Sequence, residues 1–158
     1  MVAESSRFRP TQTRIAWHCT CFNARRTSRT VTQYYDELMA PTGIKATQFT
    51  MLGAIALMGP ASVTRLARHL GLDRTTLTRN LRVLVETGLV VISEGNDRRE
   101  RVVGLTANGQ GAVERATPVW QEAQHSLAAR FGDERLRRLI EDMSELSSMI
   151  EGIEDPVG

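Results

Sequence analysis

The sequence predicts a mainly α-helical protein that carries one small β-hairpin. Apolar residues recur at spacings of three and four over most of the 158 residues, which is the period of an amphipathic helix. Glycine, proline and capping residues divide this pattern into separate helices. The period changes between residues 89 and 105, where two runs rich in Val flank a Gly-Asn-Asp turn.

Two helices are predicted in the N-terminal third. The first extends over about 19–40, and Pro41 and Gly43 end it. The second extends over 47–58, with Thr47 as its N-cap and a Gly-Pro pair after its last residue. Its inner face is expected to hold Phe49, Leu52, Ile55 and Ala56.

Two shorter helices follow in tandem. Ser62 can cap the first, Gly71 makes the turn, and Asp73 can cap the second. Gly88 lies where a left-handed C-cap residue is expected. The inner residues of the second helix are predicted to be Leu77, Leu81, Leu84 and Val85.

A hairpin comes directly after these helices. Residues 89–92 and 101–105 are expected to form its strands, and the polar stretch 93–99 its loop. The order helix, turn, helix and hairpin predicts a winged helix-turn-helix.

Two long helices complete the chain. Thr106 is expected to cap the first, which continues to about Arg130, and Pro118 should kink or briefly interrupt it. Gly132-Asp133 begins the last helix. Its apolar residues alternate between spacings of three and four, which is the pattern of helices that pack along one another. Packing within one chain is the alternative, but a seam of nearly three heptads favours a partner chain. The expected interface residues are Leu136, Leu139, Met143, Leu146 and Ile150.

The charges divide unevenly along the chain, although the net charge is only +2. Residues 1–110 carry 15 basic and 8 acidic side chains, a balance of +7, whereas residues 111–158 carry 5 and 10, a balance of −5. We therefore expect the N-terminal part to face a polyanion.

Several classes of protein are not expected. There is no apolar run of about 18 residues and no secretory signal, so neither a membrane span nor export is predicted. With two cysteines there is no disulfide framework, and we expect a reducing cytoplasm. His18, His69 and His125 are scattered, and no catalytic motif accompanies them. No catalytic residue, metal or cofactor is expected.

The second helix of the tandem pair is the candidate DNA-reading element. When its leucines face inward, arginine and threonine side chains must face outward. Arg can form a fork on guanine, and Thr can meet phosphate or the thymine methyl group. The expected DNA-contacting residues of this helix are Arg74, Thr75, Thr76, Thr78, Arg79 and Arg82.

The hairpin loop strengthens this interpretation. It carries Asp97, Arg98 and Arg99, and a basic loop beside a reading helix can enter the minor groove. Asp97 could orient one arginine through a charge-assisted hydrogen bond. A winged helix that binds another protein is the alternative, but an acidic or apolar outer face would have favoured it.

These segments resemble regulators of the MarR family. Asp97-Arg98-Arg99 resembles their D-x-R wing motif, and Leu105-Thr106 with Gly109 resembles the L-T-x-x-G start of their next helix. The stretches 64–79 and 84–90 resemble their helix-turn-helix and its end. The resemblance covers about residues 19–153.

The resemblance implies a homodimer whose wing domains each read half of a palindrome, most often as a repressor. Arg99 would be the wing-tip residue, with Asp97 as its support and Arg98 as the competitor. Residues 46–106 would form the DNA-binding domain, and 19–45 with 107–153 the helical dimerisation region. An N-terminal arm, 1–18, and a tail, 154–158, would flank them.

Two signals could control such a regulator, and a regulator without any ligand is the third option. Cys21-Phe22 resembles the reactive site of the peroxide-sensing OhrR branch, and Tyr35 occupies one of its three Tyr positions; Arg25 and Ala46 occupy the others. Cys19 is a further candidate thiol, although two residues so close on one helix point to nearly opposite sides. Ordinary, unreactive thiols are an equal alternative.

The second signal is a small organic anion, often phenolic in this family. The candidate pocket residues are Trp17, His18, Phe22, Arg25, Arg26 and Met51. A metal site at His18, Cys19 and Cys21 is a weak match, because no second ligand cluster exists.

Overall fold

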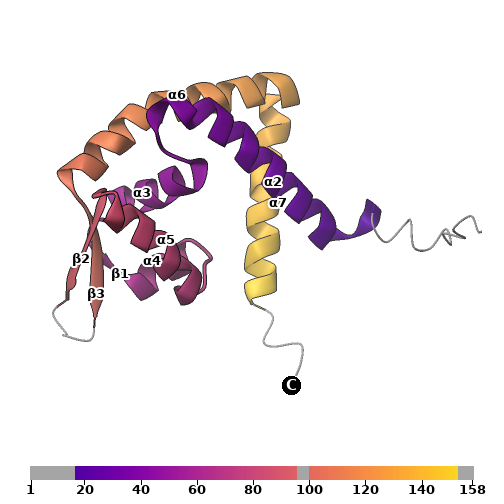
Figure 1. Cartoon of the computed structure of the whole chain (residues 1–158). Coiled ribbons are helices and arrows are strands. Elements are labelled where there is room, and N and C mark those ends of the chain that lie inside the picture. Colours follow the sequence, from indigo (N-terminus) through magenta and orange to yellow (C-terminus); the bar gives the residue numbers. More distant parts are fainter. Residues whose placement is uncertain (1–16, 96–99, 153–158) are drawn as a thin grey trace, which may run out of the picture. The chain divides into compact units, whose positions relative to one another are not determined.

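The computed structural model describes residues 17–95 and 100–152 (Figure 1). The chain divides into two compact units, residues 1–116 and 117–158, which are described separately below. None of the helices in the described ranges is both long and apolar enough to span a membrane.

The first unit begins with α2 (Thr20–Met39), the short 3-10 helix η1 (Ala40–Thr42) and α3 (Ala46–Met58). The carboxylate of Asp36 in α2 accepts a hydrogen bond from the Ala46 amide at 2.7 Å, which attaches the start of α3 to α2. The N-cap of α3 is Lys45, not Thr47 as predicted; its amide donates to the Gln48 side chain at 2.9 Å. The sequence-based prediction favoured threonine, but the partner that satisfies this helix start lies in another helix.

The tandem helices are α4 (Val63–His69) and α5 (Arg74–Glu86). Both predicted caps are confirmed: Ser62 Oγ accepts from the Arg65 amide at 3.3 Å, and Asp73 Oδ1 from the Thr76 amide at 2.8 Å. Gly71 takes a φ of 61° in the turn, a left-handed conformation that favours glycine.

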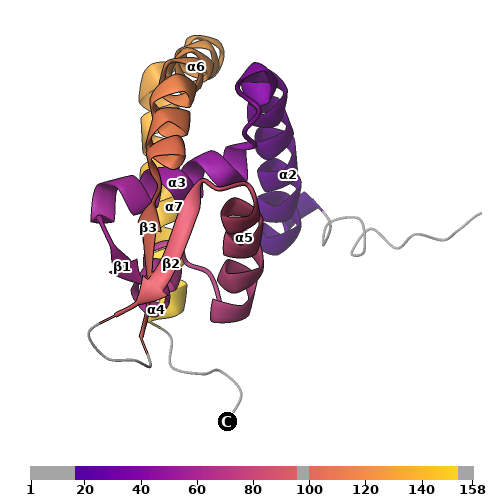
Figure 2. The same cartoon turned by 60° about the vertical axis from the view of Figure 1, so that its left-hand side comes forward.

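The hairpin strands are β2 (Val90–Glu94) and β3 (Arg101–Leu105). A third strand, β1 (Ala61–Ser62), pairs with the other edge of β3, so the antiparallel sheet has the order β1-β3-β2 (Figures 1 and 2). Val103 faces Ala61 on one side and Ile92 on the other, and it is fully buried. The sequence did not predict β1, because two residues are too few to show a period.

The core of the first unit joins α3, the tandem helices and the sheet. Its fully buried larger side chains are Met39, Leu52, Leu66, Leu77, Leu81, Leu84 and Val103. Two predicted inner residues are wrong: Ala56 is exposed, and Val85 is 40% exposed. At 100° per residue, Val85 lies about 40° around α5 from Leu81, and Ala56 lies about 40° around α3 from Leu52; Leu81 and Leu52 are fully buried. Both wrong predictions therefore fall at the edge of the covered face, where the period alone does not decide burial.

The start of α6 (Ala107–Phe131) is attached to the end of α5. Thr106 Oγ1 donates to the Gly88 carbonyl at 2.7 Å and accepts from the Gly109 amide at 3.0 Å, which confirms Thr106 as the cap. The Thr106 amide also donates to the Leu89 carbonyl at 3.1 Å. A Cβ atom at Gly109 would lie 2.0 Å from that carbonyl oxygen. The close approach of two backbone segments explains why glycine occupies this position.

No break occurs at Pro118, contrary to one of the two outcomes predicted for it. The helix continues from Ala107 to Phe131 with Pro118 inside. Proline cannot bond the carbonyl of residue 114, four positions earlier. Pro118 and Glu114 are both exposed, so water can satisfy that carbonyl.

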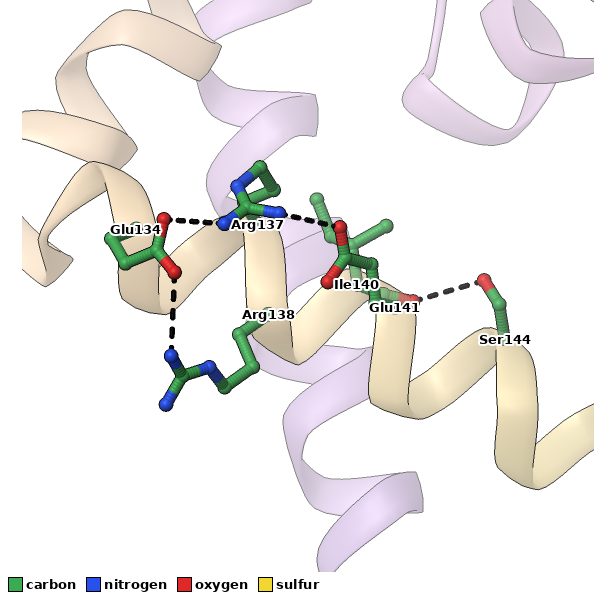
Figure 3. A network of polar contacts seen from close by, with 6 residues as sticks. All are labelled: Glu134, Arg137, Arg138, Ile140, Glu141 and Ser144. Atoms are coloured by element: carbon green, nitrogen blue, oxygen red, sulfur yellow. Dashed lines mark hydrogen bonds and ion pairs between the residues drawn. The ribbon is translucent and has the colours of Figure 1, made fainter.

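The second unit contains the end of α6 and α7 (Asp133–Glu151). Arg137 lies between Glu134 and Glu141 at 2.5 and 2.8 Å, and Arg138 lies 3.3 Å from Glu134 (Figure 3). At 100° per residue, these four residues occupy one side of α7, and the predicted apolar seam occupies the opposite side, centred about 160° from Glu134. The helix is therefore amphipathic, as its sequence predicted.

Replacement of Gly109 by alanine should lower the free energy of unfolding by about 1–3 kcal/mol, because the added methyl group overlaps the Leu89 carbonyl. Urea unfolding followed by circular dichroism at fixed protein concentration measures this. Gly53→Ala in α3 is the matched control, since its Cβ atom meets nothing within 4 Å. That variant should be neutral or up to about 1 kcal/mol more stable. Equal effects of the two substitutions would contradict the close approach.

The Asp73 cap should make stability depend on acid pH. Hydrogen bonds from the hydroxyl and amide of Thr76 lower the pKa of Asp73 below its ordinary value of 3.8. The charged cap therefore contributes fully above the unfolded pKa, and its contribution disappears as the pH falls through the lower folded pKa. Asp73→Ala should unfold at lower urea concentration at neutral pH, and the difference from wild type should shrink in acid. Asp73→Asn keeps a capping oxygen without the charge; if it behaved like the alanine variant at neutral pH, the cap would depend on charge alone.

Candidate nucleic-acid interface

Helix α5 presents one buried face and one basic face. Leu77, Leu81 and Leu84 have no exposed area, so the side chains between them turn outward. All the DNA-contacting residues predicted on this helix are exposed: Arg74, Thr75, Thr76, Thr78, Arg79 and Arg82. With Leu77 at 0°, Arg74, Thr78 and Arg82 lie at about 60°, 100° and 140°, which makes them one ridge.

The polar groups on this helix differ in how far they are already engaged. Thr76 Oγ1 donates to the Asp73 carboxylate at 2.5 Å, so its hydroxyl completes the N-cap. Arg82 Nε donates to Glu86 Oε1 at 2.7 Å, and this bond, together with the Glu86 charge, raises the pKa of Arg82. Within the described residues, Arg74 and Arg79 form no ion pair.

Helix α4 adds basic groups that the sequence analysis did not single out. Arg65 and Arg68 are exposed, whereas Leu66 and Ala67 between them are buried. This alternation of arginine with apolar residues was the signal in the sequence that could have identified Arg65 and Arg68. The side chains extend the positive surface of the tandem helices, and exposed His69 lies next to them.

The hairpin begins after the C-terminal end of α5, and its strands extend beside that helix. One end of the hairpin, where β2 ends and β3 begins, is distant from α6. This end lies toward the same side of the first unit as the start of α5 (Figure 2). Glu94 and Arg101 pair across the two strands, and their side chains approach to 3.7 Å. Asp97, Arg98 and Arg99 lie outside the described residues.

The candidate sensor residues are distributed along α2. Cys19 is the N-cap residue with an extended backbone, and Cys21 is exposed in the first turn. Cys19 therefore lies outside the helix, and the prediction that both cysteines point to opposite sides of one helix is wrong. Tyr35 follows Cys21 by fourteen residues, about 21 Å along one helix, so the two cannot meet within a chain. The Tyr35 ring meets the Tyr34 ring edge-on, with the two ring centroids 5.5 Å apart, and burial raises the pKa of Tyr35.

The candidate pocket residues do not form one enclosed site. Trp17 is 65% exposed and Phe22 45% exposed, while Met51 belongs to the core at 4%. His18 and Arg26 are also exposed. Two open hollows follow the surface of α2. One is lined by Ala24, Arg25, Ser28 and Arg29. The other, of about 590 Å³, is lined by residues from Ser28 to Ala40.

The apolar side of α7 is exposed over its whole length. Leu139, Met143, Leu146 and Ile150 are 36–55% exposed, and Leu136 is partly covered. Among the described residues, no group of three His, Cys, Asp or Glu side chains could hold a metal ion.

The chain is similar to transcriptional regulators. The MarR family model matches residues 42–100. The crystal structure of the M. tuberculosis transcriptional regulator MosR in complex with DNA is 37% identical; it covers 84% of this chain and 98% of its own, with a TM-score of 0.75.

Two further relatives agree with this fold. An uncharacterised HTH-type transcriptional regulator of Bacillus subtilis, YwoH, is 27% identical over 69% of this chain and 80% of its own length. The Bordetella bronchiseptica protein BpsR, whose DNA binding is regulated by 6-hydroxynicotinic acid, is 21% identical with a TM-score of 0.70; it covers 79% of this chain and 96% of its own.

The winged helix, the exposed basic face of α5 and the likeness to MosR agree on one class, which consists of regulators and not enzymes. The chain belongs to the MarR family of winged helix-turn-helix transcriptional regulators.

Proposed function

We propose that this protein is a cytoplasmic homodimeric repressor that reads palindromic DNA through α5 and the wing. The observation that carries the proposal is the exposed ridge of Arg74, Thr78 and Arg82, with Arg79 beside it, on a helix whose other face is fully buried. A helix held in this way can enter the major groove with its basic side first.

Within this proposal the side chains divide into two groups. Arg74 and Arg79 lack ion-pair partners in the described part of the chain, so their guanidinium groups are available for guanine edges or phosphates. Arg65 and Arg68 on α4 are exposed and would contact phosphates, which fix position and not sequence. Arg99 would enter the minor groove with Asp97 as its support; Arg98 is the competing residue.

The dimer would form through the apolar side of α7 together with α2. Four apolar residues of the predicted seam on α7 are exposed, and the first three turns of α2 are exposed on nearly all sides. A second copy would cover both. A dimer also supplies two wing domains related by symmetry, as a palindrome requires.

Release from DNA would follow binding of a small organic anion. Arg25, Arg26 and His18 lie near exposed Trp17 and Phe22 in the sequence, and basic side chains beside aromatic ones suit an aromatic carboxylate. The regulation of BpsR by 6-hydroxynicotinic acid is the precedent for such a ligand.

The test of DNA recognition is fluorescence anisotropy on the duplex directly upstream of the protein's own gene, against a random duplex of the same length. Wild type should prefer the upstream duplex, and its affinity should fall steeply with salt. Arg79→Ala should cost about 1–3 kcal/mol on the preferred duplex and much less on the random one. Arg115→Ala, an exposed arginine of α6, is the control. Equal losses on both duplexes would make Arg79 a phosphate contact, and no binding at low salt would favour a protein-interaction module.

The dimer proposal predicts that Met143→Glu yields monomers, because a carboxylate then lies in the apolar contact. Sedimentation measures the mass at a concentration where wild type is dimeric. Ser148→Glu places the same charge on the opposite, charged side of α7 and should remain dimeric. A dimeric Met143→Glu variant would exclude this side of α7 as the interface.

A second candidate function is thiol-based sensing at Cys21. The observation in its favour is the exposure of Cys21 one turn before Arg25, with Cys19 in extended backbone beside it. Tyr35 could take part only from a partner subunit. Anisotropy measured after treatment with organic peroxide separates the two candidates. Thiol-based sensing is supported if peroxide abolishes DNA binding, thiol reductant restores it, and the Cys21→Ser variant does not respond. DNA binding that peroxide does not change leaves the organic anion as the signal.

A further inference from the structure

We infer that Thr78 recognises a thymine in the major groove through its methyl group and not through its hydroxyl group. This inference rests on the proposed function, since it assumes that α5 enters the groove. It makes Thr78 a specificity-determining residue.

The position of Thr78 follows from the ridge on α5. Thr78 lies four residues after Arg74 and four before Arg82, so it is between them on one side of the helix. A docking that brings both arginines to the base edges of the major groove also brings Thr78 close to the bases between them. The side chain is exposed, so it is accessible to a groove that α5 enters.

The hydroxyl group of Thr78 is already engaged. Its Oγ1 donates to the carbonyl oxygen of Arg74 at 2.7 Å, which uses the one proton that the hydroxyl can donate. The same bond holds Oγ1 toward the preceding helical turn. Because a threonine carries two heavy atoms on Cβ and is restricted at χ1, the methyl group takes another staggered position. The ridge therefore offers the Arg74 guanidinium group and the remaining N–H groups of Arg82, with a methyl group between them.

Among the bases, thymine presents a methyl group in the major groove, and apolar contact with it is a direct form of readout. Thr76 differs from Thr78 although it has the same chemistry. Its hydroxyl donates to the Asp73 carboxylate, and at about 260° from Leu77 it lies on the opposite flank of α5. Thr76 is therefore assigned to the cap and not to recognition.

The experiment uses the full-length protein and the tightest duplex selected from a random pool. Each thymine of one half-site and its symmetry mate is replaced by deoxyuridine, which removes the 5-methyl group and leaves base pairing unchanged. The affinity of wild type should fall about fourfold per half-site at one thymine position, as expected for one methyl group returned to water. Thr78→Val keeps the methyl group of the side chain and should show the same loss of affinity. Thr78→Ser removes the methyl group and should bind the thymine and uracil duplexes equally.

Controls separate this inference from the proposed function. Thr76→Ser keeps the cap and should show the wild-type thymine preference, and thermal unfolding of each variant confirms its folding. A thymine preference that survives in Thr78→Ser but disappears in Thr78→Val would assign recognition to the hydroxyl and overturn the inference. Thymine effects unchanged in both variants would remove Thr78 from recognition, with the DNA-binding function intact. Failure of wild type to select any duplex would overturn the proposed function itself.

Discussion

The burial of Leu77, Leu81 and Leu84 is the constraint on which the rest of the first unit depends. These side chains are fully covered, and they fix the rotation of α5 about its axis. Since a helix turns by 100° per residue, no outward side chain can be moved without moving all of them. The register of the basic ridge is thus a consequence of apolar packing. A polar residue on the inner side would change both stability and the direction of every arginine.

The junction at Thr106 joins this reading unit to the long helix α6. One hydroxyl group bonds the carbonyl of Gly88 and the amide of Gly109, and the Thr106 amide bonds the Leu89 carbonyl. The end of α5, the start of β2 and the start of α6 therefore meet in a few bonds. The small size of glycine at residue 109 permits this approach. A motif that looks like a helix start in the sequence is, in three dimensions, a joint between three elements.

Hydrogen bonding within α5 distinguishes side chains that composition treats as equal. Thr76 completes a cap, Thr78 bonds its own helix, and Arg82 is held by Glu86. Such exposed pairs contribute little to stability, but they decide which donors remain for a partner. The uneven division of charge along the chain likewise bears on which part can bind a polyanion. Basic residues predominate in the first 110 residues, and acidic ones in the remainder that contains α7.

The sequence by itself determined the order of the helices and of the hairpin, the caps at Ser62, Asp73 and Thr106, and the outward face of α5, because each depends on residues within a few positions of one another. Tertiary structure decided the features that depend on distant partners. The strand β1 exists because Ala61 pairs with Val103, and α3 starts at Ala46 because Asp36 accepts its amide. The exposure of Val85 and Ala56 also follows from packing between elements. Periodicity assigns a side chain to a face of a helix, but only packing determines how wide the covered part of that face is.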